Sequence, residues 1–201
     1  MRYSTPTLFL KYLHYYWVAS NSKGHGIHSP FVFKFIREVL NASSSLKEIE
    51  NNAPATNKML EEIEAASTNK FTPKIKLLIA RLIQSLNPLT VSVTEDKKQF
   101  EANRSNNTNE TMELNESVDF AFISEGQDVD TMLRNVNKLI DNMHSNSFVI
   151  LHGIHTDSNM EAAWDQLKKH TTIRLSIDLF AIGILFCRKE QKEQEHFIIR
   201  Y

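Results

Sequence analysis

The segment Ser147 to His155, with the sequence SFVILHGIH, decides which fold we predict for this chain. Its apolar run, Phe148 to Leu151, is long enough for a strand that is buried on both faces and too short for a helix. We therefore expect it to be a central strand of a sheet. His152, Gly153 and His155 follow directly, and open α/β sheets bind their ligands at the carboxyl ends of central strands. These positions are the first place to look for a function.

The rest of the chain alternates between helix-like and strand-like segments. An amphipathic helix is expected over residues 73–86, because apolar residues recur there with helical spacing and Asn87-Pro88 then ends the pattern. Residues 97–117 are rich in Asn, Glu, Thr and Ser, and for them we expect a short helix followed by a mobile loop. Further strands are expected over residues 89–94, 118–123, 172–179, 181–187 and 196–201, and further helices over residues 128–143 and 157–169. This order predicts an α/β fold whose sheet is mostly parallel and Rossmann-like, with an antiparallel C-terminal hairpin.

The N-terminal third is predicted to form a helical cap. Residues 6–19 (PTLFLKYLHYYWVA) are apolar almost all round, which is typical of a helix that is buried or covered by a partner. Ser29 and Pro30 suit the N-cap and the first turn of a second helix, and two short polar helices are expected within residues 43–66. Nine of the 19 aromatic residues lie in the first 35 positions, so we expect the cap to dock on the sheet or on another subunit. We divide the chain into this cap, residues 1–70, and a shortened α/β domain, residues 71–201, packed as one compact unit.

Composition and charge narrow the classes of function. The formal net charge is −1, which gives no electrostatic basis for binding nucleic acid or an anionic membrane. The single cysteine, Cys187, excludes an internal disulfide and favours a reducing, cytoplasmic setting in which the thiol is buried and inert. Lys11 and His14 interrupt the N-terminal apolar residues, so we expect neither a signal peptide nor a membrane span.

Two motifs give the chain a resemblance to a known family. The first is HGIHSPF, which begins at His25, and the second is IDLF-x-x-G-x-x-F-x-RKEQ, which begins at Ile177. With the segments around them, they resemble a class I S-adenosylmethionine-dependent methyltransferase family of Bacteroidetes. The resemblance implies a methyltransferase-like sheet beneath an N-terminal helical cap, and S-adenosylmethionine as the cofactor of active members.

The chain departs from that family at the cofactor site. Members of that family carry an acidic, glycine-rich turn after their first strand, where backbone N–H groups approach the cofactor. No glycine occurs here between Gly26 and Gly126. The resemblance implies that four positions correspond to cofactor-binding residues of the family, and we expect them to be vestigial in this chain. They are Glu95, Ser124, Glu125 and His152. Since Gly153 stands where relatives have a carboxylate, we predict no catalytic residue, no bound cofactor and no metal.

Our first hypothesis is therefore a methyltransferase-fold protein that has lost cofactor binding and catalysis. It would act as a scaffold or binding subunit, as a homodimer or heteromer that associates through the N-terminal aromatic helices. One alternative is an active methyltransferase with an altered loop near Glu95, Glu125 and His152. Another is a metal-dependent hydrolase, which requires His152, His155 and Asp157 to converge on one point.

His25 and His28 flank the glycine of the first motif and leave a further choice open. The tight turn favours a structural role in which they hydrogen-bond the backbone at the corner between two helices. The alternative is that they line the entrance to a substrate site.

Overall fold

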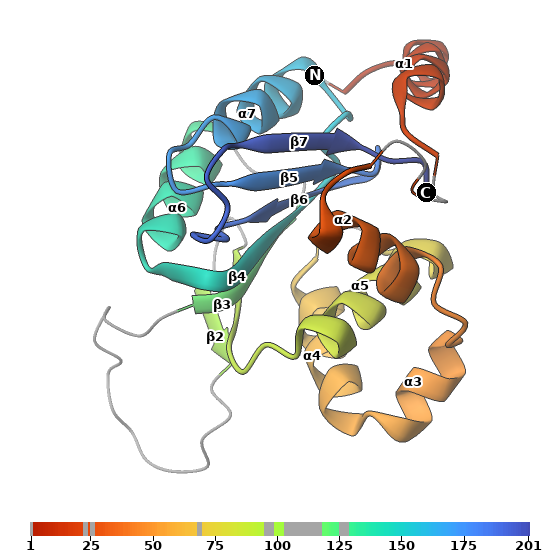
Figure 1. Cartoon of the computed structure of the whole chain (residues 1–201), viewed down its shortest axis with the longest axis vertical. Coiled ribbons are helices and arrows are strands. Elements are labelled where there is room, and N and C mark those ends of the chain that lie inside the picture. Colours follow the sequence, from red (N-terminus) through yellow and green to blue (C-terminus); the bar gives the residue numbers. More distant parts are fainter. Residues whose placement is uncertain are drawn as a thin grey trace.

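A single mixed sheet forms the centre of the molecule (Figure 1). The computed structural model describes residues 2–21, 24, 27–67, 70–94, 99–102, 118–124 and 129–201. Within these residues the strands lie in the order β2-β1-β3-β4-β6-β5-β7. Their bounds are β1 Val91–Thr94, β2 Gln99–Ala102, β3 Val118–Ile123, β4 Met143–His152, β5 Leu175–Asp178, β6 Ile182–Phe186 and β7 Glu195–Ile198. The predicted central strand is β4, which lies between β3 and β6.

The α/β class is confirmed, but the sheet is mixed rather than mostly parallel. Parallel pairs join β1 to β3, β3 to β4 and β5 to β7. Antiparallel pairs join β1 to β2, β4 to β6 and β5 to β6. The predicted C-terminal hairpin is β5–β6, and β6 enters the sheet between β4 and β5, so it adds two antiparallel pairs instead of one. The third antiparallel pair is formed by β2, which lies where a short helix was expected and pairs with the outer edge of β1.

Helices cover both faces of the sheet. One face carries α2 (Pro30–Phe35), its π-helical continuation η1 (Ile36–Leu40), α3 (Leu46–Asn52), α4 (Pro54–Ala66) and α5 (Pro73–Leu86). The opposite face carries α6 (Val129–Asp141) and α7 (Ser158–Lys168) (Figure 1). Along β4, Phe148 and Ile150 join the first hydrophobic cluster, whereas Val149 and Leu151 join the second. This alternation confirms that β4 is buried on both faces.

The first helix, α1 (Thr5–Val18), lies apart from the other cap helices (Figure 1). Its N-cap residue Ser4 accepts a hydrogen bond from the Thr7 backbone, and Pro6 occupies the first turn. The Ser20 amide donates to the Ile198 carbonyl and the Arg200 amide donates to the Ser20 carbonyl, which fastens the end of α1 beside β7. The cap helices α2 to α4 instead share one cluster with α5 and the sheet.

Candidate functional site

The strand register defines two edges of the sheet at which a site is possible. At the carboxyl edge, His152 of β4 lies opposite Ile182, and Asp178 of β5 lies opposite Ile198. At the amino edge, Phe148 and Leu175 both lie opposite Phe186 of β6, and Glu195 of β7 lies opposite Leu175. Sequence reasoning directs attention to the carboxyl edge.

Two of the four predicted cofactor-binding residues lie at the carboxyl edge, and both are covered. Ser124 is 1% exposed and His152 is 8% exposed. The ring of Phe71, which comes from the segment between α4 and α5, packs edge-on against His152 with a centroid distance of 5.6 Å. Ser67 of the same segment lies 3.3 Å from Ser124, hydroxyl oxygen to hydroxyl oxygen. Ser67 and Phe71 therefore cover the ends of β3 and β4. The other two predicted residues, Glu95 and Glu125, lie outside the described residues.

A hydrogen-bonded charge network occupies the rest of the carboxyl edge. The His155 imidazole lies between two carboxylates: its Nε2 is 2.8 Å from Asp178 Oδ2 and its Nδ1 is 3.0 Å from Glu161 Oε1. Glu161 also accepts hydrogen bonds from Lys11 Nζ at 2.9 Å and from the Tyr3 hydroxyl at 2.8 Å. The imidazole therefore joins β5 to α7, and Glu161 of α7 joins both to residues from the start of the chain. We call these five side chains the His155 network.

The electrostatics of the network favour a doubly protonated imidazole. Burial of the His155 ring acts against its charged form, but the hydrogen bonds and charges of Asp178 and Glu161 outweigh it and raise its pKa. Burial acts to raise the pKa of Glu161, yet the hydrogen bonds from Lys11, Tyr3 and His155 lower it. When the imidazole is doubly protonated, both ring nitrogens donate to carboxylates and neither has a lone pair to accept a proton or a metal. In this state the imidazole holds the two carboxylates together, and the three side chains line a pocket of about 270 Å³.

The geometry does not support the metal-dependent hydrolase. His155 uses both nitrogens within its network, and Asp157 uses its carboxylate to cap α7, accepting from the backbone amides of Asn159 and Met160 at 2.9 Å each. No group of three His, Cys, Asp or Glu side chains among the described residues is arranged to hold a metal ion. Cys187 is buried, and burial raises the pKa of its thiol to about 11, which keeps it protonated.

The outer face of α1 exposes a stripe of large apolar side chains. The opposite face contacts the body of the protein, where Lys11 enters the His155 network and Tyr15 donates to the Ile199 carbonyl. Exposure along the stripe ranges from 39% for Leu13 to 83% for Trp17. We call it the α1 face, and it consists of Phe9, Leu10, Leu13, Tyr16 and Trp17. No helix in the described part of the chain is long and apolar enough to cross a membrane.

No protein-family model, no curated protein and no solved structure matches this chain.

Sequence reasoning identified His155 but not its partners. Asp178 lies in a predicted strand and Glu161 in a predicted helix. Their spacing from His155 along the sequence matches no recognised motif. One signal was available: Asp178 follows Ile177 at the carboxyl end of a strand that is buried throughout, and a buried carboxylate requires a partner. The amino edge received no prediction of a site except the open alternative for His25 and His28, of which His25 lies outside the described residues.

Proposed function

We propose that this chain is a binding protein that self-associates through the α1 face and does not transfer methyl groups. The observation that carries this proposal is the α1 face itself: five large apolar residues on one side of a helix, left in water in the single chain. Soluble monomers rarely expose a contiguous apolar patch of more than a few hundred Å², and larger patches mark interaction surfaces.

The size of the α1 face suits a stable interface. Phe9, Tyr16 and Trp17 are 59%, 49% and 83% exposed. An aromatic side chain buries 150–250 Å² when fully covered, so these three offer about 300 to 450 Å². Leu10 and Leu13 enlarge the patch further. The α1 face thus supplies more than a third of the ~800 Å² per partner that a specific protein–protein interface requires.

A second copy of this chain is the occupant that we propose. The only charged residue of α1 is Lys11, and its ammonium group is paired with Glu161 on the body side. A cation from outside the helix contacts the face: the guanidinium group of Arg200 lies 4.3 Å from the centre of the Tyr16 ring. The helix supplies no charge to the face, which is best covered by another apolar face, and a two-fold dimer presents the same one. Leu10, Leu13 and Trp17 follow the spacing of a two-helix seam, in which residues three and four apart face one partner.

The loss of methyl transfer rests on separate observations. The chain has no glycine between Gly26 and Gly126 with which to build a cofactor turn. Phe71 covers His152, and Ser124 is fully buried beside Ser67. The resemblance to a class I methyltransferase family is supported by the α/β class and the antiparallel β5–β6 pair. We propose that this fold was retained as a scaffold for binding.

Sedimentation velocity over a range of micromolar concentrations tests the proposal. The full chain is expected to sediment with twice the mass of one chain. The double variant Leu10→Glu and Trp17→Glu places two charges in the proposed seam and is expected to sediment as a monomer, because an unpaired charge in a dry interface costs several kcal/mol. Leu89→Glu is the matched control: Leu89 is 60% exposed and lies outside α1, so this variant is expected to remain dimeric.

Two results would contradict self-association. One is a wild-type chain that is monomeric at every concentration. The other is a Leu89→Glu variant that dissociates as fully as the α1 variant, which would show a general effect of added charge. Circular dichroism of all variants establishes that each is folded.

A further inference from the structure

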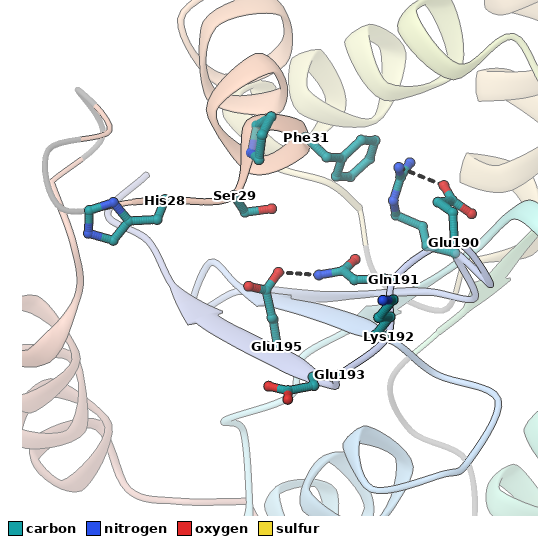
Figure 2. A pocket seen from close by; sticks show the side chains of 10 residues that line it. His28, Ser29, Phe31, Glu190, Gln191, Lys192, Glu193 and Glu195 are labelled. Atoms are coloured by element: carbon teal, nitrogen blue, oxygen red, sulfur yellow. Dashed lines mark hydrogen bonds and ion pairs between the residues drawn. The ribbon is translucent and has the colours of Figure 1, made fainter.

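A groove of about 420 Å³ opens at the amino edge of the sheet (Figure 2). One wall is the segment from His28 to Phe31, which leads into α2, and the other is the segment from Arg188 to Glu195, which joins β6 to β7. These walls contain the ends of the two motifs that give the chain its family resemblance, and the fold brings them together from opposite ends of the sequence. The volume lies within the range of small-molecule sites.

Ser29 is the buried polar group of the groove. The residue is only 8% exposed, and its hydroxyl makes no hydrogen bond with any residue that the structure describes. It occupies the N-cap position of α2, as the sequence predicts, but its side chain does not perform the capping function. Figure 2 shows the hydroxyl directed into the space between Phe31 and the pair formed by Gln191 and Glu195. The hydroxyl oxygen itself is not fully buried, so it is accessible from the groove and can bond to a ligand there.

Glu195 gives the inner part of the groove a negative charge. Its carboxylate accepts a hydrogen bond from the Gln191 side-chain amide, which is neutral. Within the described part of the chain, no cationic group lies within ion-pair distance of Glu195. The guanidinium group of Arg188 is partly engaged: Nη2 lies 2.6 Å from Glu190 Oε1 and Cζ lies 3.8 Å from the centre of the Phe31 ring, while Nε is buried without a hydrogen-bond partner among the described residues. The groove therefore offers a carboxylate and a hydroxyl oxygen to an incoming donor.

We infer that this groove binds a small organic cation that carries a primary ammonium group. An ammonium group has three donors and no acceptor, which matches the Glu195 carboxylate and the Ser29 hydroxyl oxygen. The Phe31 ring supplies an apolar wall for the carbon chain of such a ligand. Lys192 and Glu193 are exposed in the strand-joining segment and offset one another in charge, so Glu195 dominates the electrostatics of the interior.

Calorimetric titration of the full chain with 1,4-diaminobutane tests the inference. We expect saturable binding with a dissociation constant below about 1 mM. Glu195→Gln is expected to weaken binding at least about tenfold, since a charge-assisted hydrogen bond becomes a neutral one. Ser29→Ala is expected to weaken it about threefold to fivefold. Glu193→Gln removes a carboxylate outside the inner pair and is the matched control, with binding expected to change less than about twofold.

A neutral analogue separates recognition of charge from recognition of shape. Under the same conditions 1,4-butanediol is expected to give no saturable heat. The inference is overturned if the wild-type chain does not bind the diamine, if the diol binds equally well, or if Glu193→Gln weakens binding as much as Glu195→Gln. Thermal unfolding of each variant shows that the loss of binding does not come from loss of folding.

Discussion

At the carboxyl edge of the sheet, His155, Glu161 and Asp178 bond to one another beside α1 and line a pocket of about 270 Å³. At the amino edge, the Ser29 hydroxyl makes no capping hydrogen bond and faces a groove. Parallel strands direct ligands to the carboxyl edge in most α/β proteins, and there His152 and His155 are covered or engaged. The difference teaches that the position of a residue in a fold does not establish that the residue is available for binding. Availability depends on which hydrogen bonds the surrounding chain has already supplied.

The largest change in stability is expected when the Phe71 ring, which covers His152 at the carboxyl edge, is removed. Its ring is 8% exposed and packs against Phe122 and His152 at centroid distances of 5.4 and 5.6 Å. Phe71→Ala removes these contacts and leaves a cavity, so the free energy of unfolding should fall by about 3 kcal/mol. Chemical denaturation measures it, with Phe33→Ala as the control because Phe33 is 47% exposed. An equal loss in both variants would show that Phe71 does not close this edge.

The next largest effect is expected from the His155 network. His155→Gln keeps one hydrogen-bond donor but removes the positive charge between Asp178 and Glu161. The two carboxylates are 10% and 24% exposed, so the loss is only partly screened by water, and we expect the free energy of unfolding to fall by about 2 kcal/mol near pH 6. A change below about 0.5 kcal/mol would show that the three groups are not coupled.

The pH dependence of stability sharpens this result. The raised pKa of His155 means that its stabilising contribution is complete below its ordinary value of 6.5 and is lost as pH rises through the folded-state value. The lowered pKa of Glu161 has the opposite sense: its contribution is present above its ordinary value of 4.5 and is lost as pH falls through the folded-state value. Between pH 6 and pH 9 the wild-type chain should therefore lose more stability than His155→Gln, as measured by urea denaturation. Equal losses would contradict the assignment to His155.

The smallest changes in stability are expected from alanine substitutions of two N-cap serines, Ser45 and Ser29. Ser45 and Glu48 form a capping box. The Ser45 hydroxyl accepts a hydrogen bond from the Glu48 amide, and the Ser45 amide donates to Glu48 Oε2 at 2.7 Å. Ser45→Ala should lower the free energy of unfolding by about 1 kcal/mol. Ser29 makes no such bond, so Ser29→Ala should change it by less than about 0.5 kcal/mol. Equal costs in thermal denaturation would mean that Ser29 has a structural partner.

Most of the secondary structure was predictable from the chain alone. The helix over residues 73–86 and the strand over residues 118–123 have the predicted bounds, because hydrophobic periodicity and a nearby Pro or polar residue define both ends. The mixed sheet was not predictable in the same way. Whether β6 pairs beside β4 or at an edge depends on long-range contacts, and β2 lies in a polar stretch whose pairing with β1 leaves no local pattern.

The site was predictable only in location. The apolar run before His152 and His155 correctly placed these residues at the end of a central strand. Whether they remain open to a ligand depends on Phe71, which precedes His152 by 81 positions, and on Lys11 and Tyr3 at the start of the chain. Such contacts join segments that share no spacing rule. The α1 face had the opposite outcome. The apolar sequence of the helix predicted that a partner covers it, but nothing in the sequence identifies that partner.

The central claim is that the carboxyl edge no longer receives a cofactor, and calorimetric titration with S-adenosylmethionine tests it most directly. With protein shown to be folded by circular dichroism, we expect no saturable heat at high micromolar ligand. S-adenosylhomocysteine should behave in the same way. Saturable binding near 1 μM, on the order of −8 kcal/mol, would show that a cofactor site persists without the glycine turn and would contradict the account.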